Sequence, residues 1–268
     1  MALFRLEDPN NPAFRDFLES QLPYSLRFRG ALEESSGEAP VWVDDPEGPR
    51  LALQGSDKWL TLLGKPADVL HRLDEIGALP AGPPEEEGRL RFGALPLPVR
   101  DALAARRDIV RETHCGLYTL REEDFTPFRE GPEVDSLREE DAPALSSLSE
   151  YGATPAYCAE RIRSAPSAAV RIGGELASSM LVHENGSIGM LHTREEFRNR
   201  RLGRLAASAL AERQLARGKA VYCYIVDGNT PSQRVFQSLG FRRAAEVSWI
   251  VFERAEGGGG AGGGSEEK

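Results

Sequence analysis

One turn in the second half of the chain constrains the fold more than any other segment. It runs Phe197-Arg198-Asn199-Arg200-Arg201-Leu202-Gly203-Arg204, with an apolar strand predicted before it and a helix predicted after it. A turn that opens a helix points several backbone N–H groups at one place, where the helix dipole adds partial positive charge. The arginines add donor forks shaped for phosphate. The sequence therefore predicts an anion site here, and a cofactor pyrophosphate is the anion we expect.

Two more segments follow this turn. A strand is predicted over 220–226 and ends in Asp227-Gly228-Asn229, and a helix over 232–239 closes on Leu239-Gly240-Phe241. This order resembles motifs A and B of the GNAT superfamily, the acyl-CoA-dependent N-acyltransferases. The turn of that family begins with Arg or Gln, has a Gly in the middle and ends in Gly or Ala. Arg198 and Gly203 match its ends, whereas Arg201 replaces the middle Gly.

The resemblance implies how the cofactor binds. Backbone N–H groups from Arg198 to Gly203 would surround the CoA pyrophosphate, and pantetheine would pair with the strand edge at 191–193. The amide of Asn229 would hydrogen-bond pantetheine, and Ser232 would lie near the sulfur. The predicted cofactor-binding residues are Leu191, His192, Thr193, Arg198, Asn199, Arg200, Arg201, Leu202, Gly203, Arg204, Asn229, Ser232 and Phe236.

The second half has the element order of the GNAT plan, a mixed α/β (α+β) fold in which the fourth and fifth strands splay apart. Hydrophobic periodicity and turn residues predict a short strand and a helix in 135–145, a helix over 155–164, and strands over 168–172, 177–182 and 187–193. Asn185-Gly186 predicts a hairpin. A long helix over 202–217 and a last strand over 246–253 complete the pattern.

The first half is less regular. Its predicted helices cover 11–22, 66–76 and 98–113, its predicted extended segments cover 24–32, 41–43, 50–53 and 115–120, and 79–88 is a predicted loop. The charged, proline- and glycine-broken segment 121–133 predicts a boundary. We expect an N-terminal lobe over 1–126, a catalytic domain over 133–254 and a disordered glycine-rich tail over 255–268.

A closer resemblance extends over roughly 14–254. The run Leu18-Glu19-Ser20-Gln21-Leu22-Pro23-Tyr24-Ser25-Leu26 is similar to the opening of the glycine N-acyltransferase-like (FR47-like) branch. Glu150-Tyr151-Gly152 and His192-Thr193-Arg194-Glu195-Glu196-Phe197-Arg198 parallel two later segments of that branch. The resemblance implies two lobes, a degenerate GNAT-like N-terminal half and an active C-terminal half.

The general base is the least regular part of the pattern. The glycine acyltransferase-like family is expected to place a Glu at the start of the fourth strand, but that position here is Ser187, which cannot act as a base unaided. His192, beside the predicted thioester, holds a proton near neutral pH and is our predicted catalytic residue. A strand histidine with no chemical role is the alternative. His183 and Glu184 are weaker candidates, each expected as a solvated turn residue.

The general acid also departs from the family. Many GNAT enzymes place a Tyr on the last helix to protonate the sulfur, and that position here is Phe236. Tyr222 and Tyr224 are expected in the core or in a wall. Because CoA thiolate leaves readily, we expect direct transfer in a ternary complex. Cys223 has no evident base partner and is expected to be a buried strand residue.

Composition narrows the partners. The 33 basic and 42 acidic residues give a net charge of −9, which argues against a general nucleic-acid binder. Three widely spaced cysteines suggest a reducing compartment, and we expect a cytoplasmic protein. We predict no membrane span and no secretory leader. The four histidines show no metal-ligand spacing, and no metal cofactor is expected.

Three functions fit the sequence. The first is an acyl-CoA-dependent N-acyltransferase that moves an acetyl or other acyl group to a small amine or amino acid. The second is a protein N-acetyltransferase, since an acidic N-terminal lobe attracts basic peptides. The third is a non-catalytic acyl-CoA-binding module, which the replacements at Ser187, Arg201 and Phe236 favour. Acyl-chain length and oligomeric state lie beyond the sequence.

Overall fold

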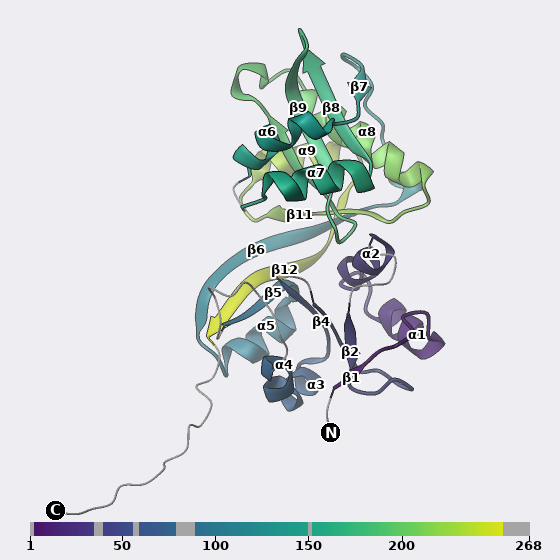
Figure 1. Cartoon of the computed structure of the whole chain (residues 1–268), viewed down its shortest axis with the longest axis vertical. Helices are drawn as coiled ribbons and strands as arrows, with labels where there is room; N and C mark the ends of the chain where they lie inside the picture. Colours follow the sequence, from purple (N-terminus) through teal and green to yellow (C-terminus); the bar gives the residue numbers. More distant parts are fainter. Residues whose placement is uncertain (1–2, 35–39, 56–58, 79–88, 150–151, 254–268) are drawn as a thin grey trace, which may run out of the picture.

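The computed structural model describes residues 3–34, 40–55, 59–78, 89–149 and 152–253. Its N-terminal half alternates short strands and short helices and occupies the lower part of Figure 1. In chain order these elements are β1 (Phe4–Arg5), α1 (Pro12–Ser20), α2 (Leu26–Glu34), β2 (Val41–Val43), β3 (Leu51–Gly55), β4 (Leu60–Gly64), α3 (Pro66–His71), α4 (Leu73–Ala78), β5 (Arg89–Pro96), α5 (Leu97–Ala104) and β6 (Ile109–Leu120).

The C-terminal half follows the order expected from the sequence and occupies the upper part of Figure 1. Its elements are β7 (Val134–Asp135), α6 (Ala142–Ser147), α7 (Pro155–Ser164), β8 (Ser167–Ile172), β9 (Glu175–Val182), β10 (Ile188–Thr193), α8 (Leu202–Ala216), β11 (Val221–Val226), α9 (Thr230–Ser238) and β12 (Arg242–Glu253). The helices α8 and α9 cover one face of this half, and α6 and α7 cover the other. Buried alanines of α8 let the helix lie close to the strands.

The described strands form two sheets. One has eight strands in the order β1-β2-β3-β4-β5-β12-β6-β11, and the other has four in the order β10-β9-β8-β7. The pairs are antiparallel except β4 with β5, which is parallel. The predicted mixed α/β fold is therefore confirmed.

The two halves share strands. β12, the last strand of the chain, lies between β5 and β6 of the N-terminal half. β6 in turn pairs with β11 of the C-terminal half, from Cys115 opposite Val226 to Leu120 opposite Val221. Both long strands run from one half into the other in Figure 1. The division predicted at 121–133 therefore separates the halves along the chain, although one sheet joins them, and it stays a proposal.

Several predictions for the N-terminal half were wrong. Residues 26–34 form a helix rather than an extended segment, because the Phe28 ring packs on Phe14 of α1 at 5.7 Å. The helix predicted over 98–113 ends at Ala104, and β6 begins at Ile109, where neighbouring strands pair with it on both sides. The helix predicted over 66–76 is broken at Arg72.

The strands β4 and β5 were absent from the prediction. Both are almost wholly buried, even at Thr61 of β4 and Arg91 of β5, so their burial lacks the alternation that marks a half-exposed strand. The loop predicted over 79–88 and the tail predicted over 255–268 lie outside the described residues. No helix within the described ranges has the length and apolar character that a membrane span requires.

Candidate functional site

The turn before α8 has an unusual backbone. Asn199 and Arg201 both have positive φ angles, 63° and 60°, and Arg201 is the residue that caps the helix. A left-handed residue followed by helical ones forms a concave set of N–H groups that binds anions. This conformation costs a non-glycine residue about 1–2 kcal/mol. The family pattern prefers Gly at the position of Arg201 for that reason, and the structure shows that the chain adopts the same turn without it.

Three arginines of this turn are exposed and only lightly held. Arg198 donates through Nε to the Thr193 carbonyl oxygen at 3.2 Å, and Arg201 lies 3.6 Å from a Glu130 carboxylate oxygen. Arg200 lies over the Phe197 ring at 5.6 Å. Exposed pairs of this kind contribute at most about 1 kcal/mol, so these guanidinium groups can turn toward an anion at little cost.

Arg204 differs from the other three. It is partly buried, donates to the Ser238 carbonyl oxygen at 3.1 Å and lies 4.5 Å from the Phe128 ring centroid. Its contacts tie α8 to α9, which supports a structural role. Leu202, next to it in the predicted set, is buried in the core under α8, so only its backbone can face a ligand.

The strand β10 carries a bulge at its centre. Its pairing with β9 shifts between Gly189 and His192, and Met190 has a positive φ of 51°. A bulge bends a strand and removes residues from the hydrogen-bonded ladder. β10 is the edge of its sheet and β11 is the edge of the other, and the two lie next to each other without pairing. This is the expected splay, and it leaves the backbone at Leu191 and Thr193 on an open strand edge.

Gly203 lies where α8 comes closest to β10. A Cβ atom at this position would lie 3.1 Å from Oγ1 of Thr193, a tighter contact than most Cβ atoms make. The Thr193 hydroxyl is also hydrogen-bonded to Oγ of Ser178 at 2.9 Å. The small residue thus lets the first turn of α8 lie against the strand edge, so the structure brings the predicted turn and strand edge together.

The predicted residues at and after the start of α9 lie in two different environments. Oδ1 of Asn229 accepts a hydrogen bond from the Ser232 backbone N–H at 3.1 Å, so the side chain caps the helix. Both residues lie at the end of β11, beside the turn that β10 leads to. Phe236 instead lies in the core, with its ring 5.0 Å from that of Phe241 and 3% of its surface exposed. Its contact with a cofactor stays a prediction.

Several polar groups are committed to the fold. The Ser187 hydroxyl, at the family position of the base, is buried and donates to Oδ1 of Asn185 at 2.6 Å. Tyr222 is buried and donates to the carbonyl oxygens of Leu26, at 3.0 Å, and Asn185. Burial raises the pKa of the Cys223 thiol well above its usual value. None of these groups is arranged to act as a base, an acid or a nucleophile.

His192 faces a small hollow on the side of α6. The hollow has a volume of about 230 Å³ and is also lined by Ser147, Ser178, Ser179 and Arg194. The backbone oxygen of His192 accepts a hydrogen bond from Oγ of Ser178 at 2.9 Å. The catalytic role of His192 stays a prediction.

His183 was expected as a solvated turn residue, and this was wrong. Its Nδ1 is hydrogen-bonded to the hydroxyl of Tyr157 on α7 at 2.7 Å, and the two rings stack at 6.2 Å. Glu184 is exposed, as expected, but its Oε2 accepts a hydrogen bond from the same hydroxyl at 2.5 Å. Tyr157 was not among the predicted residues, because nothing in the sequence shows that α7 packs on this turn.

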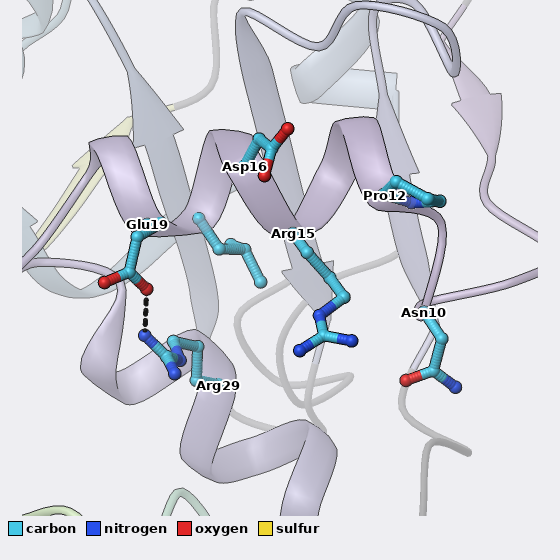
Figure 2. A pocket seen from close by; sticks show the side chains of 7 residues that line it. Asn10, Pro12, Arg15, Asp16, Glu19 and Arg29 are labelled. Atoms are coloured by element: carbon cyan, nitrogen blue, oxygen red, sulfur yellow. Dashed lines mark hydrogen bonds and ion pairs between the residues drawn. The ribbon is translucent and has the colours of Figure 1, made fainter.

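A second hollow lies in the N-terminal half. It has a volume of about 430 Å³ and lies between α1 and α2, as Figure 2 shows. Its charged rim includes Arg15 and Asp16, and an exposed ion pair joins Arg29 to Glu19 at 2.8 Å. Exposed pairs of this kind contribute little to binding or stability. The chemistry of the hollow does not match an acyl transfer site.

The N-terminal half differs at the corresponding strands. Its parallel strands β4 and β5 are paired at Leu60 and Phe92, whereas the described β10 and β11 of the C-terminal half are not paired with each other. That the GNAT-like N-terminal half is degenerate as a cofactor site stays a prediction.

Comparison with solved structures places this fold in a class. The alignment with a Drosophila protein solved by X-ray crystallography covers 94% of this chain and 98% of that one, at 17% identity and a TM-score of 0.74. The alignment with a GNAT-family acetyltransferase from Colwellia psychrerythraea covers 95% of this chain and 100% of that one, at 12% identity and a TM-score of 0.55. The alignment with a tandem GNAT protein from the clavulanic acid biosynthesis pathway covers 94% of this chain and 96% of that one, at 18% identity and a TM-score of 0.52. At these identities the likeness establishes a GNAT fold in tandem arrangement.

The family follows from a second comparison. Residues 170–250, which include β10, the arginine turn, α8, β11 and α9, match the family described as FR47-like protein. No protein of curated function matches the chain. This segment is therefore similar to the FR47-like branch of the GNAT superfamily, and the solved structures share its fold. Proteins of this superfamily use acetyl-CoA or another acyl-CoA as co-substrate.

Proposed function

We propose that the chain is an acyl-CoA-dependent N-acyltransferase whose acceptor is a small amine or an amino acid. The observation that carries the proposal is the position of the left-handed turn at Asn199–Arg201 beside two unpaired strand edges. An anion held at the helix start leaves the attached thioester arm to run along β10, where backbone groups can pair with it. A backbone N–H near the bulge would stabilise the oxyanion.

The cofactor-binding set proposed is the one predicted from the sequence, with the backbone at 191–193 and 198–203 making most contacts. The arginines at 198, 200 and 201 would supply charge. The described residues contain no group of three or more His, Cys, Asp or Glu side chains arranged for a metal. The three cysteines are buried and unbridged, and a cytoplasmic location stays a prediction.

A non-catalytic acyl-CoA-binding module is the second candidate, because the buried Ser187 hydroxyl and the buried Phe236 ring replace a base and an acid. A protein N-acetyltransferase is the third. Calorimetric titration with CoA and acetyl-CoA tests all three together. A matrix of acyl-CoA donors against amines, amino acids and peptides, followed by thiol release, then separates them.

The turn itself is tested by Gly203→Asp, which places a carboxylate next to the proposed pyrophosphate. At an effective dielectric of about 20, two charges about 6 Å apart repel by roughly 3 kcal/mol, which is a loss of affinity of about 100-fold. Gly203→Ala separates the steric part, and Gly173→Asp adds the same charge in a turn where nothing lies within 4 Å. Unchanged CoA affinity in Gly203→Asp would refute the site.

A further inference from the structure

The hairpin turn between β9 and β10 holds a chain of three hydrogen-bonded side chains. Tyr157 lies in the middle: its hydroxyl oxygen is 2.7 Å from Nδ1 of His183 and 2.5 Å from Oε2 of Glu184. Tyr157 comes from α7, whereas the other two residues come from the turn. These hydrogen bonds therefore form only when α7 packs on the hairpin turn.

The directions of these bonds follow from the number of protons. A tyrosine hydroxyl has one proton, and the nearby carboxylate can only accept it. The Tyr157 oxygen must then accept a hydrogen bond from Nδ1–H of His183. The proton of the neutral imidazole is therefore on Nδ1, and Nε2 keeps its lone pair.

Nε2 of His183 points at β10. A Cβ atom placed on Gly189 would lie 2.4 Å from this nitrogen and 2.7 Å from Cδ2 of the ring. The imidazole therefore fills the space that a side chain at position 189 would take. Gly189 is two residues from Ser187, the family position of the base, and is next to the bulge at Met190.

The charges around the imidazole come from three elements. Burial lowers the pKa of His183, and Arg27 of α2 and Arg161 of α7 lower it further, while Glu184 raises it. Arg161 is itself paired with Glu34 at 2.8 Å. Desolvation raises the pKa of Glu184, but the charge of Arg27 and the Tyr157 hydrogen bond help to lower it overall, so it stays ionised. Burial and Glu184 raise the pKa of Tyr157, so the hydroxyl stays protonated.

We propose that His183 is the general base of the acyl transfer and that Tyr157 and Glu184 are positioning residues that fix its tautomer. The proposal rests on the proposed function. Tyr157 takes the place of the buried acid that orients a catalytic histidine in other enzymes, by carrying the charge of Glu184 to Nδ1. His183 of the preceding turn thus takes over the role of the base that the family places at position 187, and its imidazole fills the space beside Gly189.

The proposed step balances as follows. Nε2 takes one proton from the acceptor ammonium, and the freed lone pair forms the C–N bond to the thioester carbonyl. The C–S bond then breaks, and the CoA thiolate takes the second proton from nitrogen. The imidazolium returns its proton to water. The products are the amide, free CoA thiol and one proton.

The test compares His183→Gln with His71→Gln, an exposed histidine of α3 that serves as the matched control. We expect His183→Gln to lower kcat about 100-fold or more while CoA affinity, measured by calorimetry, changes less than twofold. The His71→Gln control should keep its turnover. Added imidazole should restore part of the activity of His183→Ala, which a purely structural histidine would not permit.

Tyr157→Phe tests the hydrogen-bonded link between Glu184 and His183. We expect kcat to fall about tenfold and the acid limb of the kcat/KM profile to shift to lower pH, because the imidazolium loses its link to Glu184. Turnover retained within threefold in His183→Gln would overturn the proposal.

A measurement without turnover keeps the two proposals apart. Nitrogen-15 NMR of the wild-type protein should show His183 neutral at pH 7 with its proton on Nδ1, and a proton on Nε2 would overturn this inference alone. A wild type that binds CoA but acylates no amine would defeat the proposed function, and the base role with it. A wild type that turns over normally with an undiminished His183→Gln defeats only the base role.

Discussion

The packing of α2 on the hairpin turn gives a prediction of unusual sign. Gly30 is in the middle of α2, where replacement by Ala normally stabilises a helix by about 1 kcal/mol. Here a Cβ atom would lie 2.0 Å from the carbonyl oxygen of Asn185 and 2.5 Å from the hydroxyl of Tyr222. The first contact is with backbone, which cannot turn away. We therefore expect Gly30→Ala to destabilise the protein.

The magnitude follows from two costs. Overpacking a tight contact costs about 1–3 kcal/mol, and moving Tyr222 away from the buried carbonyl oxygens of Leu26 and Asn185 leaves polar groups unpaired at about 1–3 kcal/mol. After the gain in helix propensity, a net loss of about 1–5 kcal/mol remains. For a chain of this size that is a fall in Tm of roughly 2–20 °C.

Thermal and urea unfolding followed by tryptophan fluorescence measure this loss. Gly48→Ala is the control, because nothing lies within 4 Å of its Cβ position, and it should leave stability unchanged or raise it by up to about 1 kcal/mol. If Gly30→Ala proves as stable as the wild type, α2 does not lie against the 185–186 turn and the reasoning fails.

Three further predictions concern the joint between the halves. Glu34→Ala should cost about 1.5–3 kcal/mol in urea unfolding, because the buried guanidinium of Arg161 loses its buried carboxylate and keeps only Glu160 and the Val182 carbonyl oxygen. Glu34→Leu with Arg161→Met should recover most of this loss. Lowering the pH from 7 to 5 should reduce the midpoint of urea unfolding. The folded-state pKa of His183 lies below the unfolded value of 6.5, so the unfolded chain takes up the proton first and is stabilised by it. The midpoint of His183→Gln should fall less over the same pH range. A fragment of residues 133–254 should show no cooperative unfolding, because it lacks β6, the partner of β11.

The sequence predicted the C-terminal half well because its elements are locally marked. Asn185-Gly186 fixes the hairpin, and Gly218 with positive φ follows α8 near the predicted end. The N-terminal half lacks such marks. Its buried strands β4 and β5 have no alternation, and α2 is a helix because Phe28 and Gly30 meet partners that are distant in sequence. Tertiary contact decides these elements, and single-sequence patterns do not contain it.

The candidate site likewise has one part that the sequence predicted and one part that it did not. The arginine turn and its helix are contiguous in sequence, so the anion site could be predicted, although the left-handed φ of Arg201 could not. The His183 cluster joins residues 26 positions apart through a tyrosine hydroxyl. Its position also depends on Gly189, a residue whose importance is the side chain that it lacks. Such a cluster is visible only once the α7–hairpin packing is known.

The shared strands give the N-terminal half a part in the proposed cofactor site. β11 forms one edge of the proposed cofactor site, and its only paired neighbour among the described strands is β6 of the N-terminal half. On the acceptor side, α2 presses on the turn that holds His183, with Arg27 acting on its charge and Glu34 holding α7 through Arg161. The N-terminal half therefore acts on both sides of the transfer: it aligns the strand along which the thioester would lie, and it fixes the turn from which the base would act. Loss of either contact should lower turnover before it lowers CoA affinity, because the arginine turn and α8 lie wholly within the C-terminal half.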